Sequence, residues 1–302
     1  MDLARYAACH RQWIAGQEAG LAELVAAAAS AAAGRTTDEE LSAVVERCMR
    51  GYEEYATSRR AMAREDGAPF FAPPWCTAFE NAVLWLGGCR PSLTVRLLYS
   101  LSGEGLEAHI EELLSGRGRG EGGVVSGSTG MGLLGITPAQ LDQINGLHHR
   151  TLREEGLLTD RLATLQEDIA DRPLLPIIRE RERAAAAAAA ALTARHGGAN
   201  SNGFPGRLEA GGSSGGVDAE VDGAMESYRA GLAKLLEEAD ELRLSTARAL
   251  ATQILTPRQA VEMLVAGKQL HLSVRDWSRR QEREQNARLP RASTSTSSGA
   301  NP

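Results

Sequence analysis

The sequence has few aromatic residues and no long apolar run. Phenylalanine, tryptophan and tyrosine make up 4% of the 302 residues, whereas alanine is abundant. Because alanine is the best helix former and aromatic residues favour strands, this composition predicts helices packed on helices. A membrane-spanning helix needs about 20 consecutive apolar residues, and the chain has no such stretch. The opening MDLARYAACHRQW lacks the apolar core of a signal peptide, which predicts an intracellular protein.

Closely spaced cysteines, excess positive charge and catalytic motifs are also missing. Cys9, Cys48, Cys76 and Cys89 have none of the close pairing of zinc sites, so we expect reduced and mostly buried thiols. The formal net charge of −6 argues against a nucleic-acid binder that works through bulk electrostatics. The sequence shows no Ser/His/Asp set, no HExxH motif and no phosphate-binding P-loop. These absences predict a protein that is not an enzyme.

The clearest helix lies near the end of the chain, in LTPRQAVEMLVAGKQLHLSVRDW, residues 255–277. Thr256, Pro257 and Gln259 form a helix-start pattern with a capping box. Apolar residues then recur at steps of three and four, which predicts one stripe of an amphipathic helix. The stripe consists of Ala260, Met263, Leu264, Gly267, Leu270, His271, Val274 and Trp277. His271 lies inside it with Arg275 one turn further on, so this face is either core alone or also a ligand site.

Most of the remaining chain also predicts helices, divided by start and stop signals. Thr37 and Thr137 open capping-box patterns, and the second repeats the Thr-Pro start found at Thr256. The predicted helices cover residues 3–33, 38–65, 103–116, 138–171, 179–194 and 217–255, with two short helices around a break at 85–92. Pro173 and Pro176 are expected to interrupt the chain between two of these helices.

The helix predicted after Thr137 has polar residues in the middle of its apolar stripe. The stripe consists of Leu141, Ile144, His148, Thr151, Glu155, Leu158, Leu162, Leu165 and Ile169. Its polar members either form a polar pocket inside a bundle or mark where the helix turns this face to water. His148 and His149 are adjacent and point in different directions, so we expect no shared metal ion there.

These patterns predict an all-α fold, a bundle of long amphipathic helices with two flexible Gly/Ala/Ser-rich insertions. The helical domain is expected to span residues 6–283, with the insertions at about 117–136 and 195–216. The first insertion contains GSTGMGLLG, which no strand precedes and which lacks the lysine of a phosphate-binding loop. The low-complexity residues 284–302 are expected to form a disordered tail.

Several stretches together resemble the plant DELAY OF GERMINATION (DOG) family, whose domain is also the C-terminal half of TGA-type bZIP transcription factors. The first is Trp13 with Gln17 and Leu21. The others are PPWCTAFENAVLWLGGCRPS, LHHRTLREEGLLTDRLATLQEDIADRP and LTPRQAVEMLVAGKQLHLSVRDW, in the same order over residues 6–280. No basic region with leucine heptads precedes the domain, so the resemblance is closer to the dormancy-type branch than to the TGA factors.

The resemblance implies a non-catalytic regulator of seed dormancy and abscisic acid signalling that acts by protein–protein interaction, with 2C-type protein phosphatases as partners. The TGA factors imply an alternative, a nuclear or cytoplasmic protein linked to transcription that contacts DNA or other transcription factors. The last helix ends in a basic stretch, diluted by Asp276, Glu282 and Glu284. Its cations are Arg275, Arg279, Arg280, Arg283, Arg288 and Arg291. A basic amphipathic helix is also compatible with calmodulin binding, and homodimerisation stays open.

The resemblance also implies a candidate cofactor site. Some family members bind haem through two histidines one turn apart on the last helix, and residues at this spacing share a face. The first position here is His271. The second is Arg275, whose guanidinium stays protonated and cannot ligate iron. His271 is therefore a haem ligand with a partner from elsewhere in the chain, or a core histidine with no ligand.

Overall fold

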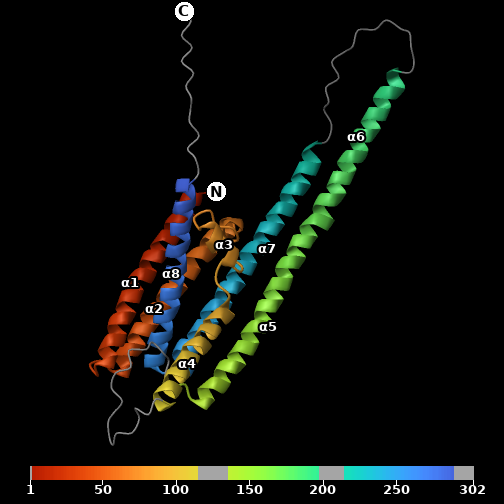
Figure 1. The fold of residues 1–302 in the computed structure, drawn as a ribbon. Coiled ribbons are helices and arrows are strands. Elements are labelled where there is room, and N and C mark those ends of the chain that lie inside the picture. Colours follow the sequence, from red (N-terminus) through yellow and green to blue (C-terminus); the bar gives the residue numbers. More distant parts are fainter. Residues whose placement is uncertain (1, 115–134, 197–213, 289–302) are drawn as a thin grey trace, which may run out of the picture.

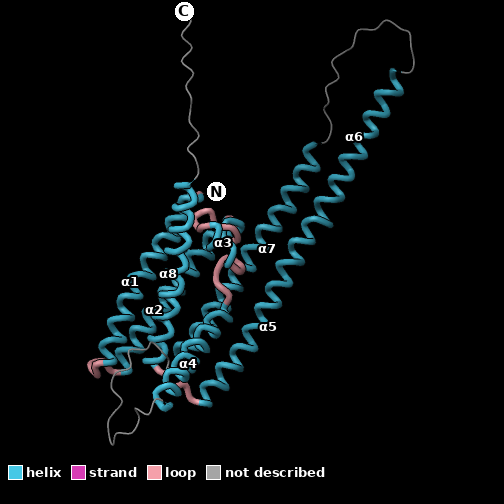
Figure 2. The backbone as a smooth tube through the Cα atoms, viewed as in Figure 1, coloured by secondary structure: helices cyan, strands magenta, loops and turns pink. Residues whose placement is uncertain are grey.

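The computed structural model describes residues 2–114, 135–196 and 214–288. Within these ranges every regular element is helical and none is a strand (Figure 2), which confirms the predicted all-α class. The helices are α1 (Leu3–Ala32), α2 (Asp38–Glu65), α3 (Ala78–Val83), α4 (Pro91–Leu114), α5 (Pro138–Ile169), α6 (Leu175–His196), α7 (Ser214–Arg248) and α8 (Pro257–Arg288). None of them has the length and apolar character to cross a bilayer.

Four of the helices begin at a threonine that closes a capping box. In each box the threonine hydroxyl accepts from the N–H three residues on, while that residue's side chain accepts from the threonine N–H. The pairs are Thr37 with Glu40, Thr77 with Glu80, Thr137 with Gln140, and Thr256 with Gln259. The two glutamines also meet, because Gln140 Nε2 donates to Gln259 Oε1 at 2.9 Å. The repeated Thr-Pro pattern thus starts α5 and α8 side by side.

The helices form a bundle with a longer arm at one side (Figure 1). α8 packs against α1, α2 and α4, while α7 joins α2 to α5. α5 and α6 form a nearly continuous rod that extends beyond the bundle (Figure 1). The main core is aliphatic and centres on Met49, Val95, Leu98, Ile144, Leu250, Ala260 and Met263. Its buried members come from α1, α2, α4, α5, α8 and the π turn at Ala249–Ile254, so the core depends on contacts between distant parts of the chain.

Two predicted interruptions are wrong. α4 continues through Gly103 to Leu114, where a separate short helix was expected. One glycine costs a helix only about 1 kcal/mol, and Val95, Leu98 and Leu101 anchor α4 in the core. The chain also stays helical past Pro173, through a π turn at Ala170–Leu174. Such a turn, followed by a new α-helix, accommodates prolines that an uninterrupted α-helix would exclude.

Several predicted boundaries shift. The described helices extend to His196 and resume at Ser214, so both ends of the expected insertion at 195–216 are helical. The rest of that insertion, and residues 115–134 of the first, lie outside the described residues. α8 reaches Arg288, so the tail predicted from 284 begins as helix. Of the predicted buried thiols, Cys89 is exposed and the other three are half-buried.

Candidate functional site

The predicted stripe of α8 is core along its first half and surface along its second. Ala260, Met263 and Leu264 are buried. Leu270 and Trp277, predicted inward, are 54% and 44% exposed. The prediction was wrong for these positions because the buried side of the second half of α8 runs through Arg275 and Ser278, which leaves Leu270 and Trp277 on the outer side of the helix.

Two cations that the stripe omitted are buried instead. Lys268 is 4% exposed, and its Nζ donates to Gln17 Oε1 on α1 at 2.6 Å. The same ammonium lies 4.8 Å from the centre of the Tyr52 ring on α2. Burial lowers the pKa of Lys268. Because a buried ammonium needs such partners, Lys268 ties α8 to α1 and α2.

Arg275 forms a buried ion pair with Glu80 of α3. Arg275 Nη1 lies 2.6 Å from Glu80 Oε1, and the two side chains are 4% and 10% exposed. The other carboxylate oxygen of Glu80 accepts from the N–H of Thr77 at 2.8 Å. Burial alone would raise the pKa of Glu80, but the Thr77 hydrogen bond and the Arg275 charge outweigh it and hold that pKa below its usual value. The pair therefore fixes α3 on α8.

Two more contacts hold α3 in place on α8. The N–H of Ala78 donates to Glu282 Oε1 at 2.9 Å, so an α8 carboxylate caps the start of α3. The rings of Phe79 and Trp277 meet edge to face, with centroids 4.8 Å apart. Phe79 is 43% exposed, so this aromatic pair lies at the surface.

His271 is exposed on α8, one turn before the buried Arg275. Packing around the imidazole and then the Arg275 charge lower the pKa of His271. The ring is thus neutral at neutral pH and chemically able to act as a ligand. Arg275 offers no second ligand, because its guanidinium is committed to Glu80. No group of three potential metal-binding side chains occurs in the part of the chain that the structure describes.

His10 of α1 lies close to this pair but is buried. Its ring centroid is 6.3 Å from that of Trp75, and its Nδ1 has no hydrogen-bond partner. Burial, followed by the charge of Arg275, lowers the pKa of His10 to about 4. Burial likewise raises the pKa of the nearby Cys76 thiol to about 11. Both groups are neutral at physiological pH, and a protonated buried thiol is a poor nucleophile.

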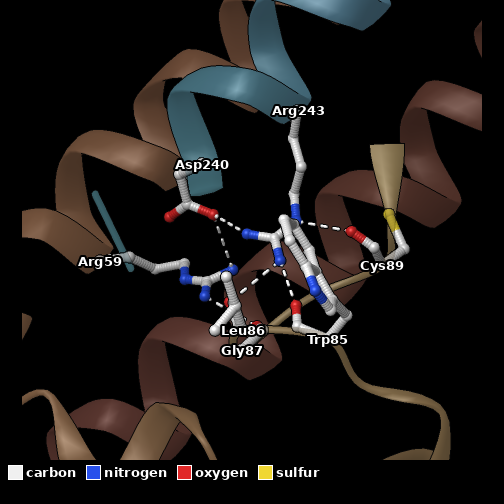
Figure 3. A network of polar contacts seen from close by, with 7 residues as sticks. All are labelled: Arg59, Trp85, Leu86, Gly87, Cys89, Asp240 and Arg243. Atoms are coloured by element: carbon white, nitrogen blue, oxygen red, sulfur yellow. Dashed lines mark hydrogen bonds and ion pairs between the residues drawn. The ribbon is translucent and has the colours of Figure 1, made fainter. Parts of the chain in front are cut away.

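The turn at residues 85–89, between α3 and α4, is held by an arginine of α7 (Figure 3). Arg243 Nε donates to the carbonyl of Cys89 at 2.7 Å, and its Nη2 donates to the carbonyls of Trp85 and Leu86. The guanidinium also lies 5.4 Å from the centre of the Trp85 ring. Three backbone carbonyls that no helix could satisfy thus share one cation.

A second arginine and an aspartate complete this clamp (Figure 3). Arg59 of α2 donates to the carbonyl of Gly87 at 2.7 Å. Asp240 of α7 lies between the two cations, with Oδ1 at 3.4 Å from Arg59 Nη1 and 2.7 Å from Arg243 Nη1. Burial lowers the pKa of Arg243, and the Asp240 charge opposes that change. We call Arg59, Asp240 and Arg243 the turn clamp.

The turn itself requires glycine. Leu86 and Gly87 both have left-handed φ values, 45° and 72°. A Cβ atom on Gly87 would lie 2.6 Å from Leu236 Cδ1 and 2.8 Å from the Arg59 guanidinium. Any other residue at Gly87 would therefore be strained and would displace the clamp. The predicted reversal at the glycine pair is confirmed, and Pro91 starts α4 as expected.

The polar middle of α5 is a set of internal supports. Glu155 is buried and accepts from Ser92 N–H at 2.7 Å and from Ser92 Oγ at 2.9 Å, which caps the start of α4. Thr151 meets Thr246 of α7, with their hydroxyl oxygens 3.3 Å apart. Of the two alternatives for this stripe, the polar cluster inside the bundle is correct, and side chains fill it.

Sequence reasoning missed the turn clamp. Arg59, Asp240 and Arg243 all occupy inward positions of otherwise apolar stripes. That placement was the available signal, because a charged residue in such a stripe needs a buried partner. The partners themselves were not predictable, since most are backbone carbonyls of a turn distant in sequence.

The protein is an all-α bundle whose buried charged side chains hold the turn at residues 85–89, fix α3 on α8, cap α4 and join α8 to α1 and α2. Residues 20–100 match the family described as seed dormancy control. Protein DOG1-like 3 of Arabidopsis thaliana is 30% identical over 276 residues, which are 91% of this chain and 84% of that protein. Protein RESPONSE TO ABA AND SALT 1 of the same plant is 28% identical over 236 residues, 78% of this chain and 76% of that protein. Transcription factor LG2 of Oryza sativa subsp. japonica matches 61 residues at 38% identity, 20% of this chain and 11% of that protein.

The all-α fold and these relatives together indicate a class of protein, the all-α regulators related to dormancy and abscisic acid responses. Within that class, the chain belongs to the DOG1 family of seed dormancy control proteins. The partial matches to transcription factors agree with the domain shared by the two groups.

Proposed function

We propose that this protein is a non-catalytic regulator of dormancy and abscisic acid responses that works by binding other proteins, among them 2C-type protein phosphatases. One observation carries the proposal: the buried charges of α8, Lys268 and Arg275, have polar partners inside the bundle, whereas large apolar and aromatic side chains of α3 and α8 are exposed. Glu80 and Arg275 are bound to each other, and Phe79 and Trp277 face solvent. Such a surface supports binding rather than bond-making chemistry.

The test is direct binding to purified 2C-type phosphatases, measured by calorimetry together with phosphatase activity. We expect a micromolar or tighter complex and a change in phosphatase activity when the protein is in excess. A set of plant 2C-type phosphatases that neither bind nor change activity would reject the phosphatase as partner. Phosphatases of an unrelated class serve as the control.

A role in transcription, in the nucleus and the cytoplasm, is the second candidate. It is supported by the match to transcription factor LG2 and by the exposed Arg279, Arg280 and Arg283 near the end of α8. If these arginines contact DNA phosphates, gel-shift affinity should fall steeply with salt and on the triple change to glutamine. If the affinity changes neither with salt nor in the triple variant, these arginines do not contact DNA. The same basic stretch is the proposed calmodulin segment, to be tested by calcium-dependent binding of the same triple variant.

Single-histidine haem binding at His271 is the third candidate, supported by a neutral imidazole exposed on α8. Titration with hemin should then give a Soret band that His271→Ala removes and His149→Ala, at an exposed histidine of α5, leaves unchanged. A band that survives His271→Ala would place the ligand elsewhere. Sedimentation of the apo protein tests the proposed homodimer.

A further inference from the structure

Exposed apolar side chains gather on one face of the bundle. Thirteen large apolar side chains are exposed among the described residues. Five of them belong to α3, the start of α4 and the second half of α8: Phe79, Val83, Leu93, Leu270 and Trp277. Each is between 43% and 54% exposed. We call this surface the α3–α4–α8 face.

The contacts between the three helices bring these side chains together. α3 runs antiparallel to α8, because Ala78 meets Glu282 whereas Glu80 meets Arg275. Phe79 touches Trp277, so Val83, one turn further along α3, lies toward Leu270.

The start of α4 adds the remaining member of the face. A Cβ on Gly267 of α8 would lie 3.8 Å from Leu97 of α4. α4 and α8 run in opposite directions (Figure 1). Leu93, one turn before Leu97, is therefore level with His271, one turn after Gly267. The face is thus continuous across three helices.

The face is also rigid. The Arg275–Glu80 pair and the Glu282 cap fix α3 on α8. The turn clamp fixes the connection from α3 to α4 (Figure 3). Anchors held in place before binding lose little conformational entropy when a partner arrives, so they contribute more to affinity.

The charges around the face have the opposite sign to the chain as a whole. The exposed arginines beside the face are Arg90, directly before α4, Arg96 of α4, and Arg279, Arg280 and Arg283 of α8. The exposed acidic residues beside the face, counted along α8 as far as Glu284, are Asp276 and Glu284. The chain carries a net charge of −6, so this is a locally basic rim on an acidic protein. Such a rim attracts carboxylates.

We propose that the α3–α4–α8 face binds an acidic amphipathic helix of a partner protein. Bulky apolar side chains at the i, i+3, i+4 and i+7 positions of that helix cover Phe79, Leu270 and Trp277, while its carboxylates meet the arginine rim. The exposed Trp277, paired with Phe79, is the anchor of this face, because tryptophan is enriched at interface hot spots. A second copy of this chain is a poorer occupant, since it would present the same arginines. The proposal rests on the proposed function and names the surface through which it would act.

The test uses a fluorescein-labelled synthetic helix with leucine and phenylalanine at the four anchor positions and glutamate elsewhere. Anisotropy with the full-length protein should give a micromolar Kd that weakens as salt is raised. Phe79→Ala and Trp277→Ala should each weaken binding about tenfold or more. Leu157→Ala, at a 57% exposed leucine of α5, is the matched control and should change Kd less than about twofold.

A charge pair at Val83 keeps the test independent of folding. Val83 is 54% exposed at the end of α3, so neither Val83→Glu nor Val83→Lys should disturb the fold. Val83→Glu should weaken binding of the acidic peptide. Val83→Lys should bind the peptide at least as tightly as the neutral reference variant Val83→Gln. Equal affinity of all three, no saturable binding at about 100 µM, or an equally tight complex with a lysine version of the peptide would overturn the proposal.

The phosphatase measurement separates this inference from the proposed function. If wild-type protein binds a 2C-type phosphatase and Trp277→Ala binds it equally well, the proposed partner stands and this face is not its docking surface. If no phosphatase binds but the acidic peptide binds through Phe79 and Trp277, the α3–α4–α8 face is a binding surface and its partner is a different protein. Dimerisation abolished by Trp277→Ala would instead assign the face to a second copy and overturn the proposal.

Discussion

The turn clamp and the α3–α4–α8 face depart in opposite ways from the usual distribution of charged and apolar side chains in a helical bundle. The clamp buries three charged side chains, with Arg59 and Asp240 only 6% and 8% exposed. The face leaves Phe79 and Trp277 open to water. Both depart from the rule that charges lie outside and aromatics inside. The clamp fixes α3 and α4, and the face consists of the side chains that these helices then present, so one region serves stability and the other binding.

The largest effect should come from removing the aspartate of the clamp. Asp240→Ala leaves two buried guanidinium groups without a counter-charge, which should cost about 4–5 kcal/mol of the free energy of unfolding. Urea unfolding followed by circular dichroism measures the cost. Glu241→Ala, at the exposed neighbouring position, should cost less than about 0.5 kcal/mol. If both variants lose the same small amount, the clamp does not stabilise the fold.

The next largest effect concerns the pair that joins α3 to α8. Arg275→Met leaves the buried Glu80 carboxylate uncompensated and should cost about 3–4 kcal/mol. Glu80→Gln keeps an acceptor for Thr77 but removes the charge. The double variant Arg275→Met/Glu80→Gln should therefore lose less free energy of unfolding than the sum of the two single losses, by about 1 kcal/mol or more. Exposed Arg279→Met is the control. Additive losses would mean that the pair is not coupled.

The buried histidine makes stability depend on pH. His10 has a pKa of about 4 in the folded protein, against about 6.5 unfolded. Between these values the unfolded chain binds a proton that the native protein does not, so stability falls as pH drops from about 6.5 toward 4, by about 3 kcal/mol in total. His10→Leu should flatten the stability curve in this window, whereas His149→Leu should not. An unchanged slope in His10→Leu would assign the pH dependence to other groups.

The smallest effect on stability should occur on the face itself. Trp277→Ala removes one half-exposed ring and its contact with Phe79, which should cost only about 1 kcal/mol. The comparison predicts that this variant loses partner binding while it keeps its fold. A loss of stability as large as that of Asp240→Ala would make Trp277 a core residue and would remove the contrast between the two regions.

Much of the helical scaffold was predictable because its signals are local. Thr37, Thr137 and Thr256 each cap a helix where the sequence predicted one, since a capping box needs only four consecutive residues. The exposure of Trp277 was not predictable in the same way. Helical period shows which side chains share a face, but whether another helix covers that face depends on where α3 and α4 end in space.

The candidate site was partly predictable. The sequence singled out His271 as a candidate haem ligand, which stays a prediction, and it excluded paired histidine ligation by this helix because position 275 is an arginine. The role of Arg275 as the partner of Glu80 could not be predicted, because the two residues are 195 positions apart in the chain. The turn clamp was hidden for the same reason.

The affinity of Trp277→Ala for the acidic amphipathic peptide, measured beside its free energy of unfolding, shows whether the exposed aromatic pair binds a partner without supporting the fold. We predict that affinity falls about tenfold or more while the free energy of unfolding falls by only about 1 kcal/mol. Wild-type affinity in this variant, with Leu157→Ala behaving identically, would contradict the account, because it would show that the exposed aromatic pair of α3 and α8 is not a binding surface.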